Sequence, residues 1–330
     1  MTAADRTLLT GWFSFRDGEA TAGDVLALNR VQSVLDRAGH AYDTVWSPAF
    51  RPDALHLDDV RPEAYGSLVF VCGPLHGPQV ADLHRRFPHC LRIAVGTSVI
   101  RPGSPAVTGF HRVLARDGPA LEPVRDLSAR APAAPALPVV GVILTRGQRE
   151  YGDRRRHEET ADRITRWLLA KDCARVELET RLDTKDWRLC ATPGQLDSVL
   201  ERLDLVVTDR LHGLVLSLRA GVPALAVDPV ESGAKVTAQA RSCGWPALVA
   251  AEDLGDERLE RWWDWCLTEG TDTACRIRAD FRSGRTPDNA DGLLRALTRR
   301  PPGDGRPAPG GHWMPHPGNT VSHERPESPG

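Results

Sequence analysis

Short apolar runs alternate with amphipathic stretches along most of this 330-residue chain, and this alternation constrains its fold more than any other feature. The runs at 68–72 and 205–208 have the length of buried strands. Segment 24–38 instead spaces its apolar residues three and four apart, as one face of a helix requires. Strands that alternate with helices form parallel sheets covered on both faces. The sequence therefore predicts an α/β protein.

The same pattern gives expected bounds for each element, and it occurs in both halves of the chain. In the first half we expect strands at 8–15, 42–46, 68–72, 91–95 and 112–115, with helices at 24–38 and 80–87. In the second half we expect strands at 139–144, 175–178, 205–208 and 224–227, with helices at 157–169, 196–203, 211–220 and 234–243 and a helical remainder at 257–298.

Two shifts in composition divide the chain. Prolines recur through 128–138 and exclude regular helix or strand at its end, so this segment is the expected linker. Residues 301–330 are rich in Pro and Gly and poor in aliphatic side chains, which predicts a disordered tail. The expected organisation is a domain at 1–127, the linker, and a domain at 139–300 that ends in helices. The two domains would be Rossmann-like and face a cleft.

Charge and composition exclude several classes of protein. Lys and Arg together number 42 and Asp and Glu 44, a balance that argues against nucleic acid or an anionic membrane as the main partner. No apolar run approaches the length of a membrane span, and the N-terminus lacks the pattern of a signal peptide. The seven cysteines include no CxxC pair, so we expect reduced thiols in the cytoplasm and no metal. Arg far outnumbers Lys, which is typical of a high-GC bacterial source.

The sharpest polar constellation follows the strand expected at 205–208. Asp209, Arg210 and His212 arrive together where the next helix begins. Ligands of open α/β sheets bind at the carboxyl ends of strands, and a helix N-terminus there offers free N–H groups to an anion. Arg210 adds a planar fork for phosphate or carboxylate, and His212 exchanges protons near neutrality. The alternative is a structural helix start capped by Thr208 or Asp209, with Arg210 solvated and His212 packed.

A second loop, at 229–235, follows the next expected strand. It contains Ser232 and Gly233 and ends in Lys235 before another helix. A loop of this composition can cradle a phosphate, although it is not a Walker motif. The alternative is a plain helix start with Ser232 as its cap.

A third turn, at 17–24, lies between the first expected strand and helix. Its Gly23 permits close approach of the backbone to a ligand, and Asp24 would either cap the helix or act in the cleft. The GxGxxG fingerprint of dinucleotide-binding proteins is absent here.

Three motifs resemble those of the polysaccharide pyruvyl transferases, over roughly residues 8–245. The run TDRLHGLVLSLRAGVPALAVD at 208–228, with GAK following, is similar to the C-terminal signature of that family. GEATAGDVLA at 18–27 resembles its glycine-Asp turn, and LARD at 114–117 resembles its mid-chain Arg-Asp step. The resemblance implies a GT-B-like fold of two Rossmann-like domains, with the first domain on the acceptor side.

The resemblance also implies an activity, in which the pyruvyl group of phosphoenolpyruvate moves onto two hydroxyls of a sugar and forms a cyclic ketal. Arg210 would hold a donor anion, His212 would act as acid or base, and Asp24 would act in the cleft. The expected substrate contacts are Gly23, Arg146, Arg210, Leu211, Ser232, Gly233 and Lys235. Phosphoenolpyruvate is then a donor substrate, the acceptor is a carbohydrate, and no cofactor is required. The sequence does not give the oligomeric state.

Two other functions stay open at this stage. A glycosyltransferase that uses a nucleotide sugar would share the fold, but it predicts two Glu residues eight apart at the donor site, and none is convincing. A non-catalytic protein that binds a sugar or metabolite is the third possibility. The run 154–157 is expected to be a solvated charge run, and Trp262, Trp263 and Trp265 are expected to pack rather than to bind sugar.

Overall fold

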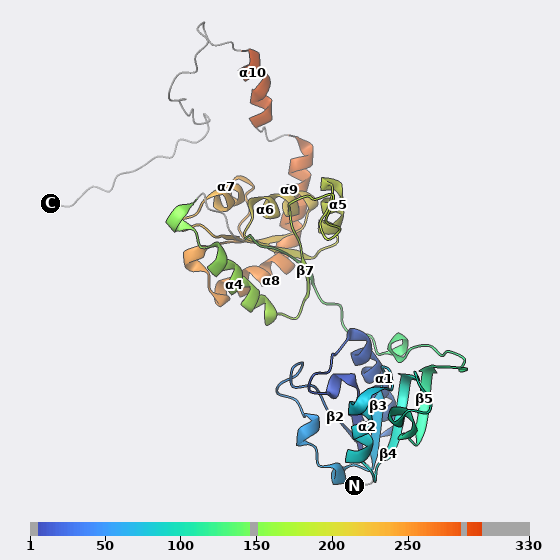
Figure 1. Cartoon of the computed structure of the whole chain (residues 1–330). Helices are drawn as coiled ribbons and strands as arrows, with labels where there is room; N and C mark the ends of the chain where they lie inside the picture. Colours follow the sequence, from blue (N-terminus) through green and yellow to red (C-terminus); the bar gives the residue numbers. More distant parts are fainter. Residues whose placement is uncertain (1–5, 146–150, 285–288, 299–330) are drawn as a thin grey trace, which may run out of the picture. The chain divides into compact units, whose positions relative to one another are not determined.

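The computed structural model describes residues 6–145, 151–284 and 289–298. The chain divides into two compact units, Met1–Ala136 and Leu137–Gly330. The division lies inside the segment 128–138. Figure 1 shows that each unit has its own sheet with helices on both of its faces.

The first unit contains a five-stranded sheet in the order β2-β1-β3-β4-β5, with all neighbours parallel. Its strands are β1 (Thr7–Thr10), β2 (Tyr42–Thr44), β3 (Ser67–Val71), β4 (Leu91–Ser98) and β5 (Arg112–Asp117). Its helices are α1 (Ala22–Ala38), α2 (Gly77–Arg86) and α3 (Pro105–Thr108), with short 3₁₀ helices η2 (Trp12–Ser14), η3 (Leu57–Asp59), η4 (Pro62–Ala64) and η5 (Leu127–Arg130).

Successive residues of β1, which lies between β2 and β3, point to opposite faces of this sheet, and both faces are covered. Leu8 packs in one buried cluster with Val80 of α2, and Leu9 packs in another with Leu28 of α1. All of these side chains are fully buried. A strand buried on both faces is continuously apolar, which explains why β1 lacks the alternation of a half-exposed strand.

The second unit repeats this architecture in the order β10-β9-β8-β6-β7, again with parallel neighbours throughout. Its strands are β6 (Val139–Ile143), β7 (Ala174–Glu177), β8 (Leu205–Thr208), β9 (Ala224–Asp228) and β10 (Leu248–Ala250). Its α-helices are α4 (His157–Leu169), α5 (Pro193–Leu200), α6 (Leu211–Ala220), α7 (Lys235–Ser242), α8 (Asp256–Leu267), α9 (Glu269–Ser283) and α10 (Leu293–Thr298), with 3₁₀ turns η6 (Gly152–Arg154), η7 (Ala251–Asp253) and η8 (Asn289–Gly292).

The helices of the second unit form two layers around its sheet. Figure 1 places α4 and α8 on one face and α5, α6 and α7 on the other. Trp167 of α4 meets Trp263 of α8 edge to face, with ring centroids 5.5 Å apart, and Trp245 meets Trp265 in the same way at 5.2 Å. The prediction that the tryptophans of α8 pack in the core is therefore confirmed for Trp263, which is buried.

The predicted fold class, an α/β protein of two Rossmann-like units with C-terminal helices, is confirmed. The strand expected at 8–15 is wrong beyond Thr10, because a 3₁₀ turn replaces it. A side chain at Gly11 would lie 2.8 Å from the carbonyl oxygen of Val71, so glycine lets the chain pass that strand closely. The 3₁₀ helix η5 extends over the first residues of the expected linker, and its Leu127 packs against the core of the first unit. The tail expected at 301–330 lies outside the described residues.

Membrane spans and metal clusters were two further questions raised by the sequence. Within the described residues, no helix is long and apolar enough to cross a membrane. Over the same ranges, no three His, Cys, Asp or Glu side chains gather as a metal site would require. All seven cysteines are unpaired.

A candidate anion site at the carboxyl edge of the second sheet

The carboxyl ends of four adjacent parallel strands lie along one edge of the second sheet. Thr145 follows β6, Glu179 follows β7, Arg210 follows β8 and Asp228 ends β9. This edge is where open α/β sheets bind their ligands. The predicted residues at 210–212 and the loop at 229–235 therefore follow the neighbouring strands β8 and β9 at the same edge.

Helix α6 begins three residues after the end of β8. Its N-cap is Arg210 itself, in an extended conformation, and no side chain caps it. The backbone N–H of Arg210 donates instead to Thr208 Oγ1 at 3.0 Å, and that hydroxyl donates to the Ile143 carbonyl oxygen at 2.8 Å. No described residue accepts a hydrogen bond from the backbone N–H groups of 211–213. These amides and the positive end of the helix are available to an anion.

Gly213 explains how the helix can start so close to the strand. A side chain at this position would place its Cβ atom 2.1 Å from Thr208 Oγ1, which is a steric clash. Thr208 is itself fully buried, so it has no space to move into. Glycine is therefore required for the close approach of α6 to the end of β8.

The side chains of Arg210 and His212 are directed away from the core. Arg210 forms an ion pair with Glu179, and the two side chains are 24% and 34% exposed. His212 is exposed, and no described residue makes a hydrogen bond or ion pair with its ring. The alternative of a solvated Arg210 and a packed His212 is therefore wrong. Glu179 was not predicted, because it lies 31 positions before Arg210 and belongs to no motif with it.

Asp209 turns in the opposite direction, into the protein. It is 2% exposed, and its Oδ1 accepts the backbone N–H of Thr145 at 2.7 Å. Its Oδ2 has no hydrogen-bond partner among the described residues. Burial raises the pKa of Asp209 to about 7, although the hydrogen bond from Thr145 opposes the shift. Asp209 therefore ties the end of β8 to the end of β6, and it does not cap α6.

The loop at 229–235 differs from one of the two predictions made for it. Asp228 is fully buried, and its carboxylate accepts the N–H groups of Ala234 and Thr237 at 2.7 and 2.8 Å and that of Val230 at 3.1 Å. Asp228 thus accepts N–H groups at the start of α7, and Ser232 as the cap of this helix is wrong. A phosphate contact of this loop stays a prediction.

The individual residues of that loop take the following places. Ser232 and Gly233 both have positive φ, 64° and 77°, and form the turn that leads into α7. Lys235, the first residue of α7, lies with its Nζ 5.5 Å from the ring centroid of Tyr151. Substrate binding by Ser232 and Gly233 stays a prediction.

The segment before α4 lies beside this loop. The backbone N–H of Arg156 donates to the Pro229 carbonyl oxygen at 2.8 Å, and that of Glu231 donates to the Arg154 carbonyl oxygen at 2.9 Å. His157 is 1% exposed and stacks with Tyr151, so a solvated charge run is wrong for this residue. The predicted donor contact Arg146 lies outside the described residues.

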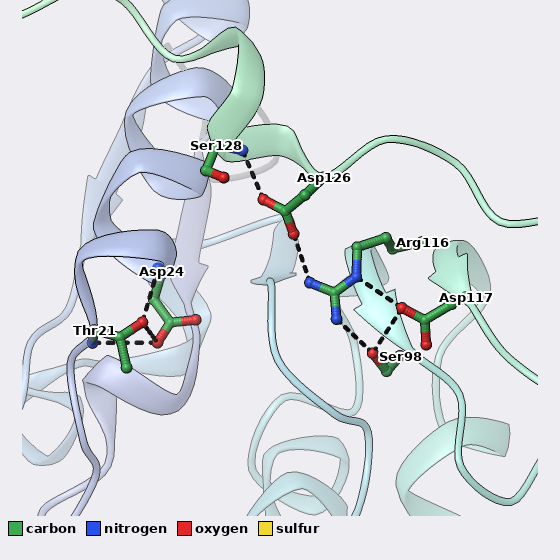
Figure 2. A network of polar contacts seen from close by, with 7 residues as sticks. All are labelled: Thr21, Asp24, Ser98, Arg116, Asp117, Asp126 and Ser128. Carbon is green, nitrogen blue, oxygen red and sulfur yellow. Dashed lines mark hydrogen bonds and ion pairs between the residues drawn. The ribbon is translucent and has the colours of Figure 1, made fainter.

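In the first unit, Asp24 has a structural role at the start of α1 (Figure 2). The Thr21 hydroxyl donates to Asp24 Oδ2 at 2.7 Å, and the backbone N–H of Asp24 donates to Thr21 Oγ1 at 3.2 Å. This reciprocal capping box matches the structural alternative given for Asp24. Burial, with Asp24 nearby, raises the pKa of the Cys72 thiol to about 11. A catalytic part for Asp24 and a substrate contact for Gly23 stay predictions.

The Arg-Asp step at 116–117 also has a structural role, shown in Figure 2. Arg116 donates to Asp117 and to Ser98 Oγ, both at 2.7 Å, and to Asp126 at 2.5 Å. Asp126 in turn accepts the backbone N–H of Ser128 in η5 at 2.8 Å. Arg116 therefore joins the ends of β4 and β5 to the segment that leaves the first unit.

The fold and this edge define an α/β protein in which helix α6 begins, without a side-chain cap, at the carboxyl edge of the second sheet. Residues 151–229 match the sequence model of the polysaccharide pyruvyl transferase family. The matched segment contains Arg210, Leu211 and His212, and it confirms the resemblance and the enzyme class, a transferase, predicted from the sequence. It spans less than half of the chain. No curated protein gives a significant match.

Several solved structures resemble the chain weakly over most of its length. Spinosyn rhamnosyltransferase SpnG with spinosyn aglycone is 12% identical, with 89% of this chain and 100% of that chain covered at a TM-score of 0.34. The glycosyltransferase of kitacinnamycin is 12% identical, with 89% of this chain and 99% of that chain covered at a TM-score of 0.34. UDP-GlcNAc 2-epimerase of Methanocaldococcus jannaschii is 9% identical, with 84% of this chain and 99% of that chain covered at a TM-score of 0.29. The fold class stated above rests on the topology of each sheet.

Proposed function

We propose that this protein transfers the pyruvyl group of phosphoenolpyruvate to two hydroxyls of a carbohydrate, which gives a cyclic ketal and phosphate. The observation that carries the proposal is the start of α6. Arg210 and His212 lie there beside uncapped backbone amides, inside the segment that matches the family.

The charge of phosphoenolpyruvate suits this place. The donor carries a phosphate and a carboxylate, and the helix start offers three N–H groups and a positive partial charge of about half an elementary charge. Arg210 supplies a guanidinium that can bind either group in a bidentate manner. Lys235 and Arg146 are the proposed second cationic contacts, since the donor has two anionic groups.

The chemistry requires proton transfers that an exposed imidazole can perform. A proton added to the methylene carbon makes C2 electrophilic, and the first sugar hydroxyl then forms a C–O bond to C2. The second hydroxyl displaces phosphate and closes the ketal. The two hydroxyl protons balance the proton taken by the methylene carbon and the proton taken by phosphate. We assign His212 to this proton transfer, because no described residue competes for its ring.

Calorimetric titration with phosphoenolpyruvate tests the donor assignment. We expect the wild type to bind, and Arg210→Ala to weaken binding by about 10- to 100-fold, as the loss of charged hydrogen bonds implies. His212→Ala should still bind the donor but should release no phosphate when saccharide acceptors are added. Arg219→Ala is the matched control, because Arg219 pairs with Asp197 near the other end of α6 and should leave both measurements unchanged.

Two outcomes would overturn the proposal. One is a wild type that fails to bind phosphoenolpyruvate with or without saccharides. The other is equal binding by wild type and Arg210→Ala. Titration with nucleotide sugars would then test a glycosyltransferase, the alternative named from the sequence.

A further inference from the structure

The loop between β7 and α5 is closed by its own hydrogen bonds. The backbone N–H of Asp183 donates to the Cys190 carbonyl oxygen at 3.0 Å and joins the two ends of the loop. Asp183 Oδ1 accepts the N–H groups of Lys185 and Asp186 at 2.8 and 3.2 Å. The backbone N–H of Leu189 donates to the Asp186 carbonyl oxygen at 3.0 Å. The tip of the loop is therefore held in one conformation.

This ordered tip holds an indole ring in solvent. Trp187 is 91% exposed, more than any other large apolar side chain in the described ranges. Tryptophan is enriched at binding surfaces, where one side of its ring contacts an apolar partner and its N–H stays near water. The neighbours of Trp187 along the chain, Asp186 and Arg188, both line a cavity next to the loop.

That cavity is polar, and most of its charged side chains form ion pairs. It has a volume of about 320 Å³, and its walls include Glu177, Glu179, Arg181, Asp186 and Arg188. Arg188 pairs with Asp186 at 2.7 Å, and Glu179 pairs with Arg210. The hydrogen bond from Arg188 lowers the pKa of Asp186 to about 2, so this pair stays charged at neutral pH.

The charges that line the cavity indicate the class of ligand that it can bind. Three carboxylates, of Glu177, Glu179 and Asp186, and two guanidinium groups, of Arg181 and Arg188, line the cavity. Glu177 forms no ion pair with any described residue, so the walls carry one negative charge in excess. This excess is unfavourable for a phosphate or a nucleotide. A neutral ligand rich in hydroxyls could donate to the carboxylates and accept from the guanidinium groups.

We propose that this loop and cavity form a binding subsite for a neutral saccharide, with a sugar ring stacked on Trp187. The weakly positive C–H groups of a pyranose face suit the electron-rich face of an indole. The cavity volume lies in the range of small-ligand sites. That the saccharide is the acceptor of pyruvyl transfer rests on the proposed function. Glu179 supports this reading, because it lines the cavity and also contacts Arg210, so bound hydroxyls would lie next to the donor site.

Saturation-transfer NMR and calorimetry with methyl hexopyranosides and their disaccharides test the subsite directly, without the donor. We expect Trp187→Ala to weaken saccharide binding by about three- to tenfold, and Trp187→Phe to retain most of it, since a ring face remains. Glu177→Gln should weaken binding as well. Leu169→Ala is the control, because Leu169 is 68% exposed at the end of α4 in the same unit and away from the loop.

The outcomes separate this inference from the proposed function. Saccharide binding that is lost in Trp187→Ala supports the subsite, whether or not phosphoenolpyruvate binds. Equal saccharide binding by wild type and Trp187→Ala, or no saccharide binding by the wild type, overturns it. Wild type and Trp187→Ala should bind phosphoenolpyruvate equally. If only the donor assignment is wrong, the titration with phosphoenolpyruvate fails while saccharide binding still depends on Trp187.

Discussion

Two buried aspartates lie at the ends of neighbouring strands of the second sheet, and only one of them accepts hydrogen bonds from the start of the next helix. Asp228, at the end of β9, uses both carboxylate oxygens to accept three backbone N–H groups, two of them at the start of α7. Asp209, just after β8, turns back to the N–H of Thr145 and keeps Oδ2 without a partner among the described residues. One helix start is thus closed by a carboxylate of the protein, and the other is left open.

The difference shows which helix start can receive an external anion. A carboxylate that already accepts the first amides of a helix takes the place that a phosphate would occupy. At α6 no carboxylate of the described residues accepts the first backbone N–H groups, and Arg210 is the N-cap residue. The closed start stabilises the fold, whereas the open start leaves its hydrogen-bonding groups for a ligand.

The largest expected effect concerns the pH dependence of stability at Asp209. The pKa of this carboxyl is raised from 3.8 to about 7 in the folded protein, so the folded state keeps a proton that the unfolded state loses earlier. Its contribution to stability is full below pH 4, falls as the pH rises to about 7, and then stays constant. The loss amounts to at most about 4 kcal/mol.

Denaturation with urea from pH 4 to pH 8 measures this contribution as the difference between wild type and Asp209→Asn. The variant cannot ionise at this position, so its free energy of unfolding should fall less than that of the wild type as the pH rises from 4 to 7. Parallel curves for the two proteins would mean that Asp209 is ionised in the folded state throughout this range.

The next effect is the loss of the closed helix start. Asp228→Ala leaves three backbone N–H groups without their acceptor in a fully buried place, and we expect the free energy of unfolding to fall by about 3 kcal/mol. Asp228→Asn keeps one acceptor oxygen and should lose less. Urea denaturation at constant pH gives both values, and an Asp228→Ala variant as stable as the wild type would contradict the assigned role.

Much of the fold follows from the sequence because local pattern determines it. The bounds expected for 157–169, 205–208 and 211–220 are those of α4, β8 and α6, where apolar spacing and the glycine after α6 agree. The strand expected at 8–15 failed because its apolar side chains continue past Gly11, while the backbone turns there to pass β3. Close approach of another strand has no signature in local periodicity.

The site was predicted only in part, for a related reason. Asp209 and Asp228 both follow an apolar strand and precede a helix, so the sequence alone does not show which one caps. Asp209 turns toward Thr145, which follows β6 and is distant in sequence but adjacent in the sheet. Asp228 instead accepts N–H groups from the loop and helix that follow it directly. The pairing of Arg210 with Glu179 is equally non-local, whereas Arg210 and His212 were found through a contiguous motif.

A substitution at Gly213 would close the open helix start by steric means. In Gly213→Ala the new Cβ would meet Thr208 Oγ1 at 2.1 Å, and we expect a loss of about 2 kcal/mol of stability as α6 moves away from β8. The displacement should also weaken binding of phosphoenolpyruvate. Gly194→Ala in the first turn of α5 is the control, since a Cβ there meets no atom within 4 Å and alanine favours the helix. Equal stability of the two variants would show that α6 tolerates the shift.

The smallest effect concerns Glu179, whose carboxylate contacts the Arg210 side chain at the start of α6. Glu179 pairs with Arg210, so an incoming anion competes with it for the guanidinium. Glu179→Gln removes the competing charge, and the affinity for phosphoenolpyruvate should rise about two- to fivefold, because partly exposed ion pairs contribute up to about 1 kcal/mol. Asp197→Asn is the control, since it breaks the pair with Arg219 on the same helix and should leave calorimetric affinity unchanged. Weaker binding in Glu179→Gln would mean that Glu179 orients Arg210 for the donor rather than competing with it, and the open start would then depend on a carboxylate as the closed one does.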